Sequence, residues 1–169
     1  MMRAISQWKD LQQRSFTALF AELLLAELRA ECDNSPVQLM VVPGRRSSLR
    51  KRGYAPMVDL MKSMRALGAP DVTIAERALI WTSQPAEQRE LSDVDRDLNV
   101  AGKLAVEFLP EGRLVLVEDV VTSGATLREA LRAVSTVGRR IDSIVALAVP
   151  RHNLSQDFVK SVAKPLQRA

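Results

Sequence analysis

The most informative stretch of the sequence is LVLVEDVVTSGAT, which runs from Leu114 to Thr126. Its four apolar residues, Leu114–Val117, form a short run that predicts a strand buried on both faces of a parallel sheet. Glu118 and Asp119 follow directly. Because an unpaired charge is costly to bury, we expect both carboxylates to point into a crevice at the carboxyl end of this strand.

A small turn rich in hydroxyl groups follows, made of Thr122, Ser123, Gly124, Ala125 and Thr126. Apolar residues at helical spacing come next, between Leu127 and Val137, and Gly138 ends the pattern. Such a turn offers backbone N–H groups, hydroxyl donors and the positive end of a helix dipole, which together suit a phosphate. The two acids can accept hydrogen bonds from a pair of adjacent hydroxyl groups on a ligand. Together with a phosphate site, this favours a ribose 5-phosphate.

Residues Leu114–Thr126 resemble the phosphoribosyl pyrophosphate signature of the type I phosphoribosyltransferases. The resemblance implies that Glu118 and Asp119 are catalytic and hold the ribose 2- and 3-hydroxyls, and that the loop binds the 5-phosphate. The implied phosphoribosyl pyrophosphate site comprises Glu118, Asp119, Val120, Val121, Thr122, Ser123, Gly124, Ala125 and Thr126. The alternative interpretation is a buried strand followed by a capped helix, with the two acids merely solvated.

Two further segments resemble the ComF-type branch of this superfamily. Val42–Pro43 ends a predicted strand, and Arg52–Gly53–Tyr54 closes an arginine-rich stretch. Ahead of the signature, the spacing typical of the branch is reproduced by Gln88, Leu91, Arg96 and Asn99. The chain departs from the branch in lacking a cysteine-rich zinc ribbon and in having Ala55–Pro56 where Asn-Gln is common. The branch is named for DNA uptake, so the resemblance implies a phosphoribosyl pyrophosphate site more directly than it implies turnover.

The composition is that of an ordinary globular protein, with 169 residues, 47% hydrophobic and 26% charged. This length predicts a single domain, and the resemblance implies that residues 1–169 form a phosphoribosyltransferase-like domain. The lone cysteine, Cys32, excludes an internal disulfide and is consistent with a reducing compartment. No apolar run is long enough to span a membrane or to form a signal-peptide core. We therefore expect a cytoplasmic protein that does not contact a membrane.

The chain divides into a helical flank or hood (1–35), a core (36–150) and a tail (151–169). A continuous helix is predicted from Arg3 to about Ala30. Besides the signature, the core has predicted strands at Val37–Val42, Val72–Trp81, Leu98–Leu109 and Ile141–Val149, and a helix over Met57–Leu67. Strands that alternate with helices predict an α/β fold with a mostly parallel central sheet and helices on both faces.

Five cations and no acid lie between Arg45 and Arg52. The resemblance implies that Arg45, Arg46 and Arg52 bind pyrophosphate, and a solvated basic face or a nucleic-acid surface is the alternative. Aromatic residues make up only 4% of the chain, which disfavours nucleic acid without excluding it. The polar segment from 82 to 97, with Gln88 and Arg96, is either a lid over the site or an ordinary connection.

These observations favour an enzyme of nucleoside metabolism that transfers a phosphoribosyl group to a nitrogen nucleophile and releases pyrophosphate. Mg²⁺ is expected to bind mainly through the pyrophosphate, because the sequence has no cluster of protein metal ligands. Neither the nucleophile nor a nucleobase is identified, and a homodimer is left open. The alternative is a non-catalytic regulator that binds phosphoribosyl pyrophosphate, or a competence protein that acts in DNA uptake.

Overall fold

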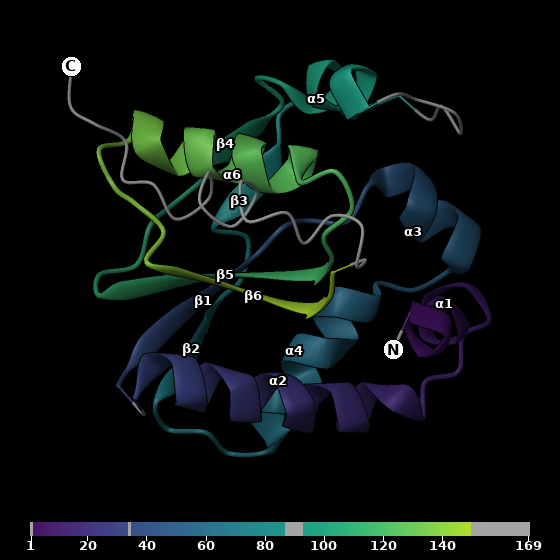
Figure 1. Ribbon diagram of the computed structural model, residues 1–169, viewed down its shortest axis with the longest axis vertical. Coiled ribbons are helices and arrows are strands. Elements are labelled where there is room, and N and C mark those ends of the chain that lie inside the picture. Colours follow the sequence, from purple (N-terminus) through teal and green to yellow (C-terminus); the bar gives the residue numbers. More distant parts are fainter. Residues whose placement is uncertain (1, 34, 87–92, 150–169) are drawn as a thin grey trace.

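The structure is a computed structural model, and it describes residues 2–33, 35–86 and 93–149. Its centre is a parallel sheet with the strand order β2-β1-β5-β6 (Figure 1). The bounds are β1 Val37–Val41, β2 Val72–Ala75, β5 Arg113–Val120 and β6 Ser143–Ala148. The strand of the signature, β5, lies in the middle, where it pairs with β1 on one side and β6 on the other. The central position explains why its apolar residues are completely buried.

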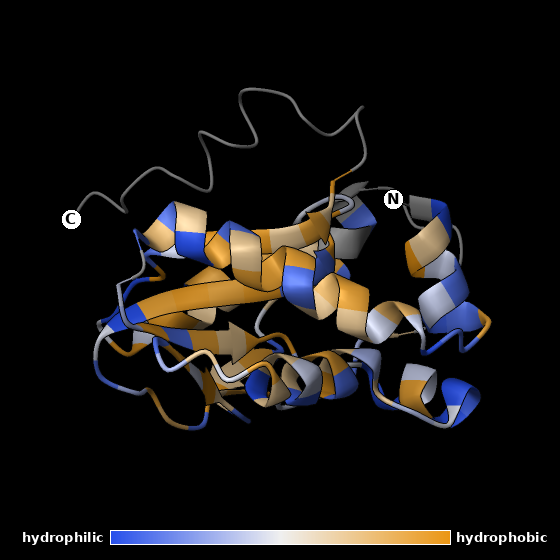
Figure 2. Ribbon diagram, turned by 90° about the horizontal axis from the view of Figure 1, so that it is seen from below, coloured by the Kyte–Doolittle hydropathy of each residue, from blue (hydrophilic) through white to orange (hydrophobic). Residues whose placement is uncertain are grey.

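Helices cover both faces of this sheet, which confirms the predicted α/β fold. Val115 and Val117 pack with α2 (Phe16–Cys32) and α4 (Pro56–Ala66) on one face. The opposite face, with Leu114 and Leu116, packs with α6 (Ala125–Thr136) and with a small antiparallel sheet of β3 (Leu79–Trp81) and β4 (Leu104–Val106). This division follows from the alternation of side chains along a strand. In Figure 1 the sheet lies between α6 and α2, and Figure 2 shows that its central strands are mostly hydrophobic.

The prediction of one continuous helix at the start of the chain is wrong. Two helices form instead, α1 (Met2–Asp10) and α2, and Gln12 between them has a φ of 55°. The break lets Trp8 of α1 fold back, so that its ring centroid lies 5.2 Å from that of Phe20 in α2. Ser15 directly precedes α2, and a serine before an apolar helical pattern is a helix-start signal that was available in the sequence.

The single strand predicted over Val72–Trp81 is also wrong. It is divided into β2 and β3 by a turn at Arg77, whose φ is 63°, and the two halves join different sheets. The strand predicted over Leu98–Leu109 is reduced to β4, because residues 98–100 belong to α5 (Asp93–Val100). Gly102, with a φ of 70°, makes the turn between α5 and β4.

The arginine-rich segment forms a short helix, α3 (Arg46–Arg52), which ends at Gly53 with a φ of 70°. Pro56 is the first residue of α4, a position that tolerates proline because the first N–H of a helix has no partner within it. The other predicted elements are confirmed, namely the strands near 37–42 and 141–149 and the helices near 57–67 and 127–137. The tail 151–169 lies outside the described residues. No helix in the described ranges is long and apolar enough to cross a membrane.

Candidate functional site

The carboxyl ends of the parallel strands meet at one edge of the sheet, and the chemistry-bearing residues gather there. In Figure 1, β5 and β6 run toward α1 and α3, which flank this edge. The turn after β1 (43–45) and the loop after β5 (121–124) leave the sheet at the same edge. This is where open α/β sheets place their ligands.

The loop after β5 surrounds a small hollow of about 30 Å³, lined by Glu118 and by residues 120–127. Val121 N–H donates to the carbonyl of Ala148 at 3.0 Å, which fixes the loop to β6. Gly124 precedes α6 with a φ of 76°, a conformation that favours glycine. The Ser123 hydroxyl accepts a 3.4 Å hydrogen bond from the N–H of Ala125, the first residue of α6, and the positive end of the helix dipole faces the loop.

Glu118 lies on the α6 face of β5, because its side chain shares the alternation of Leu114 and Leu116. Its Oε2 atom is shielded from solvent and has no hydrogen-bond partner among the described residues. Burial and, after it, the neighbouring charge of Asp119 raise the pKa of Glu118 to about 8, against the opposing effects of Lys9 and Arg45. A buried carboxyl oxygen without a partner is costly, which makes Glu118 a candidate for binding a ligand.

Asp119 lies on the opposite face of β5 and does not line the hollow. Its Oδ2 atom is 2.5 Å from Nζ of Lys9 in α1, and its Oδ1 atom accepts a 2.6 Å hydrogen bond from Val120 N–H. The residue is only 9% exposed. The structure thus brings both acids to the expected edge but turns them to different sides of the strand.

Arg45 is the predicted cation whose charge acts on Glu118, where it opposes the rise of the pKa. Its backbone is fixed on both sides. The carbonyl of Pro43 accepts a 2.6 Å hydrogen bond from Trp81 Nε1, and the N–H of Arg46 donates to Gln84 Oε1 at 2.9 Å. The turn after β1 is therefore a stable support for the Arg45 side chain.

The other predicted site residues are not all gathered at this point. The Arg46 side chain is exposed, and Arg52 makes an ion pair with Asp10 at 3.0 Å. Gln88 lies outside the described residues, and Arg96 lies in α5. Asn99 of the same pattern holds the backbone of Ala86 through hydrogen bonds of 2.8 and 2.9 Å, which is a structural role.

Sequence reasoning missed three residues that build this edge, namely Lys9, Trp81 and Gln84. Each of them contacts a residue far away in the chain, and no local pattern indicates such a contact. In the sequence, Tyr54 stands out only as the end of the Arg52–Gly53–Tyr54 motif. Its hydroxyl donates to the carbonyl of Trp8 and its ring lies 4.9 Å from the guanidinium carbon of Arg14, so it fixes α1 beside α3. Among the residues that the structure covers, no group of three or more potential metal ligands lies together.

The raised pKa of Glu118 predicts a pH-dependent effect of Glu118→Gln on stability. Between about pH 4.5 and pH 8 the unfolded chain loses this proton while the folded chain keeps it, so the wild-type protein loses stability as the pH rises. Glu118→Gln does not titrate. Its free energy of unfolding relative to wild type should therefore increase between about pH 5 and pH 8.5, by on the order of 4 kcal/mol in urea titrations. A difference that stays constant with pH would contradict the burial of this carboxyl.

Comparison with known proteins gives structural matches only, since no family model and no curated sequence matches the chain. The structure is similar to a hypoxanthine phosphoribosyl transferase of Trypanosoma cruzi, with 16% identity, 82% of this chain covered and a TM-score of 0.44. It is also similar to a hypoxanthine phosphoribosyltransferase of Staphylococcus aureus, with 16% identity, 80% of this chain covered and a TM-score of 0.41. The match spans 65% and 64% of the length of those two proteins.

Proposed function

We propose that the protein is a phosphoribosyltransferase-like enzyme, which binds phosphoribosyl pyrophosphate and transfers its phosphoribosyl group to a nitrogen nucleophile. The observation that carries this proposal is the hollow after β5, where the N-terminus of α6 lies beside a buried acid that has one oxygen without a partner. The helix end suits a phosphate, and the acid suits hydroxyl groups. Ribose 5-phosphate combines these two groups.

Each part of the edge has a role in this proposal. The loop 122–126 binds the 5-phosphate, and Glu118 and Asp119 accept hydrogen bonds from the ribose hydroxyls. Arg45 and Arg46, at the turn after β1, bind the pyrophosphate and stabilise the negative charge that grows on it as the bond to ribose C1 breaks. Arg52, which the structure pairs with Asp10, supports the position of α3.

Mg²⁺ fits this site as a partner of the pyrophosphate. Glu118 offers an oxygen without a partner, and Asp119 offers a second carboxylate at the same edge. Bound Mg²⁺ supplies neutralisation of the charge on the leaving pyrophosphate. The described residues contribute the rest, namely the orientation of the ribose by the acids and of the 5-phosphate by the loop.

We further propose that the chain forms a single phosphoribosyltransferase-like domain of the ComF-type branch. It would act in nucleoside metabolism in the cytoplasm, and a lid that includes Gln88 and Arg96 would close over its site. The acceptor and a homodimer are left open. Cys32 is a free and buried thiol, which is compatible with a reducing compartment.

The reaction is tested by measuring Mg²⁺-dependent pyrophosphate release from phosphoribosyl pyrophosphate over a panel of purine and pyrimidine bases and amines. The proposal expects release with at least one acceptor and loss of release in Arg45→Ala with Arg46→Ala. Lys62→Ala, an exposed position on α4, is the control for the loss of a surface cation. Binding without release by any acceptor would favour the second candidate.

The second candidate is a non-catalytic regulator, or a competence protein in DNA uptake, that keeps the phosphoribosyl pyrophosphate site. The ion pair between Lys9 and Asp119 favours it, because an acid that is already paired is less available for turnover. A regulator should show ligand-dependent binding to a protein or nucleic-acid partner. An enzyme should show product instead.

A further inference from the structure

Lys9 covers Asp119 at the edge of the site. The side chains of Lys9 and Asp119 are only 21% and 12% exposed, and their charged atoms are 2.5 Å apart. The second carboxylate oxygen of Asp119 accepts the hydrogen bond from Val120 N–H. Both oxygens therefore have a partner and the side chain is only 12% exposed, so a ligand that approaches this acid competes with Lys9 for it.

The backbone that carries Lys9 is fixed. Trp8, the preceding residue, is completely buried, and its carbonyl accepts a hydrogen bond from the hydroxyl of Tyr54. Asp10, the following residue, is paired with Arg52 of α3. Detaching α1 would break all these contacts, whereas rotating the four-carbon side chain of Lys9 breaks only one ion pair.

Of the two partners of Asp119, Lys9 is thus the one that can leave. The Val120 N–H is part of the strand, while the lysine ammonium is strongly hydrated and reaches water through its flexible chain. We propose that Lys9 is a displaceable counter-ion of Asp119, and that hydroxyl groups of a bound sugar phosphate replace it. This inference rests on the proposed function, since it names how the same site selects its ligand.

The selection arises from the different positions of the two acids. A phosphate in the hollow after β5 meets Glu118 and the loop but not Asp119, which does not line that hollow. Inorganic phosphate should therefore leave the Lys9–Asp119 pair intact. Ribose 5-phosphate brings hydroxyl groups together with the phosphate, so it should release Lys9.

The displacement is tested on the wild-type protein by reductive methylation of lysines followed by mass spectrometry. With saturating ribose 5-phosphate, the methylation rate of Lys9 should rise about threefold or more, as expected when an ion pair worth up to about 1 kcal/mol is broken. Inorganic phosphate should leave the rate unchanged, and the exposed Lys62 is the internal control. A slower rate with ribose 5-phosphate would show that Lys9 contacts the ligand, and an unchanged rate would show that the pair is permanent. Either result overturns the inference.

Lys9→Met provides the second test, because it removes the competing cation and keeps an unbranched side chain that is only one atom shorter. It should bind ribose 5-phosphate about threefold more tightly than wild type and inorganic phosphate equally well. Lys62→Met makes the same change of net charge and should bind both ligands like wild type. Equal or weaker binding by Lys9→Met overturns this inference alone. No binding of ribose 5-phosphate by either protein overturns the proposed function and the inference with it.

Discussion

Replacing Asp119 with Asn should lower the affinity for phosphoribosyl pyrophosphate by ~10-fold or more, equivalent to about 1.4 kcal/mol. The amide keeps the size of the carboxylate but removes its charge, and a charge-assisted hydrogen bond contributes roughly 1.5–3 kcal/mol. Ligand-free stability should change little. The loss of the pair with Lys9 costs little because its flexible chain can carry the ammonium into water, and the charge of Asp119 no longer raises the pKa of Glu118.

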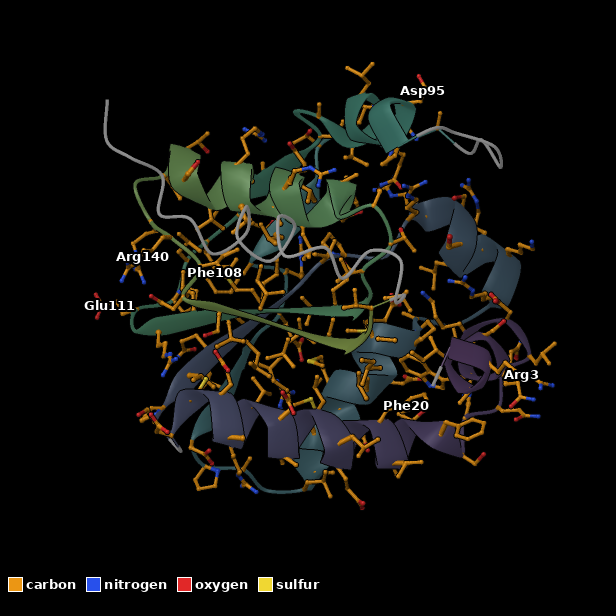
Figure 3. The ribbon with its side chains drawn as sticks, viewed as in Figure 1. Arg3, Phe20, Asp95, Phe108, Glu111 and Arg140 are labelled. Carbon is orange, nitrogen blue, oxygen red and sulfur yellow. The ribbon has the colours of Figure 1, made fainter. Side chains whose placement is uncertain are left out.

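Glu111→Gln is the matched control for this experiment. Glu111 is exposed in the turn before β5, at the other end of the same strand, and Figure 3 labels it on the side of the molecule opposite Arg3 of α1. Its replacement should leave both affinity and melting temperature unchanged. If Asp119→Asn instead lowers the melting temperature strongly while affinity stays at the wild-type value, Asp119 is a structural residue.

Glu129→Ala should produce the largest loss of stability, about 3 kcal/mol, since it leaves the buried Leu104 N–H group without its acceptor and removes the charge-assisted hydrogen bonds from Arg132. Glu129 is 4% exposed and accepts hydrogen bonds from Leu104 N–H at 2.9 Å and from Arg132 at 2.7 Å. Arg132 in turn donates to the carbonyl of Leu104. The two side chains thus attach β4 to α6, and through β3 they support Trp81 beneath the turn of Arg45.

The electrostatics of Glu129 agree with this role. Burial raises the pKa of Glu129. The hydrogen bonds from Arg132 and from the backbone of Leu104 and Gly102 outweigh this effect, so the pKa is lowered overall. The melting temperature of Glu129→Ala should fall by roughly 6–12 °C in scanning calorimetry. Glu107→Ala is the control, because Glu107 pairs with Arg77 on the surface and its loss should cost less than about 1 kcal/mol. Equal losses in the two variants would contradict the role given to Glu129.

The sequence predicted secondary structure best where the local pattern of apolar residues matches the residues that are buried in the fold. The apolar run 114–117 predicted a central strand, and the hydroxyl-rich turn and helical spacing predicted the start of α6, because both depend on neighbours in the chain. The strand continues to Val120, beyond its predicted end. Because side chains alternate along a strand, Glu118 and Asp119 in this added part of β5 lie on opposite faces. A strand that ended at Val117, as predicted, did not show this difference.

The partners of the acids could not be predicted in this way. Lys9 precedes Asp119 by 110 positions, and it reaches the site only because the chain breaks between α1 and α2. The arginine-rich segment has glycines on both sides, Gly44 and Gly53, which fit a loop as well as a short helix. Tertiary contacts decide both cases, and a local pattern carries no information about them.

The most direct test of the central claim is calorimetric titration of the protein with phosphoribosyl pyrophosphate in the presence and absence of Mg²⁺. The account predicts saturable binding at one site per chain that is stronger with Mg²⁺ and is weakened by Asp119→Asn but not by Glu111→Gln. Absence of heat at millimolar ligand with Mg²⁺, for a protein shown to be folded by its melting transition, would contradict it.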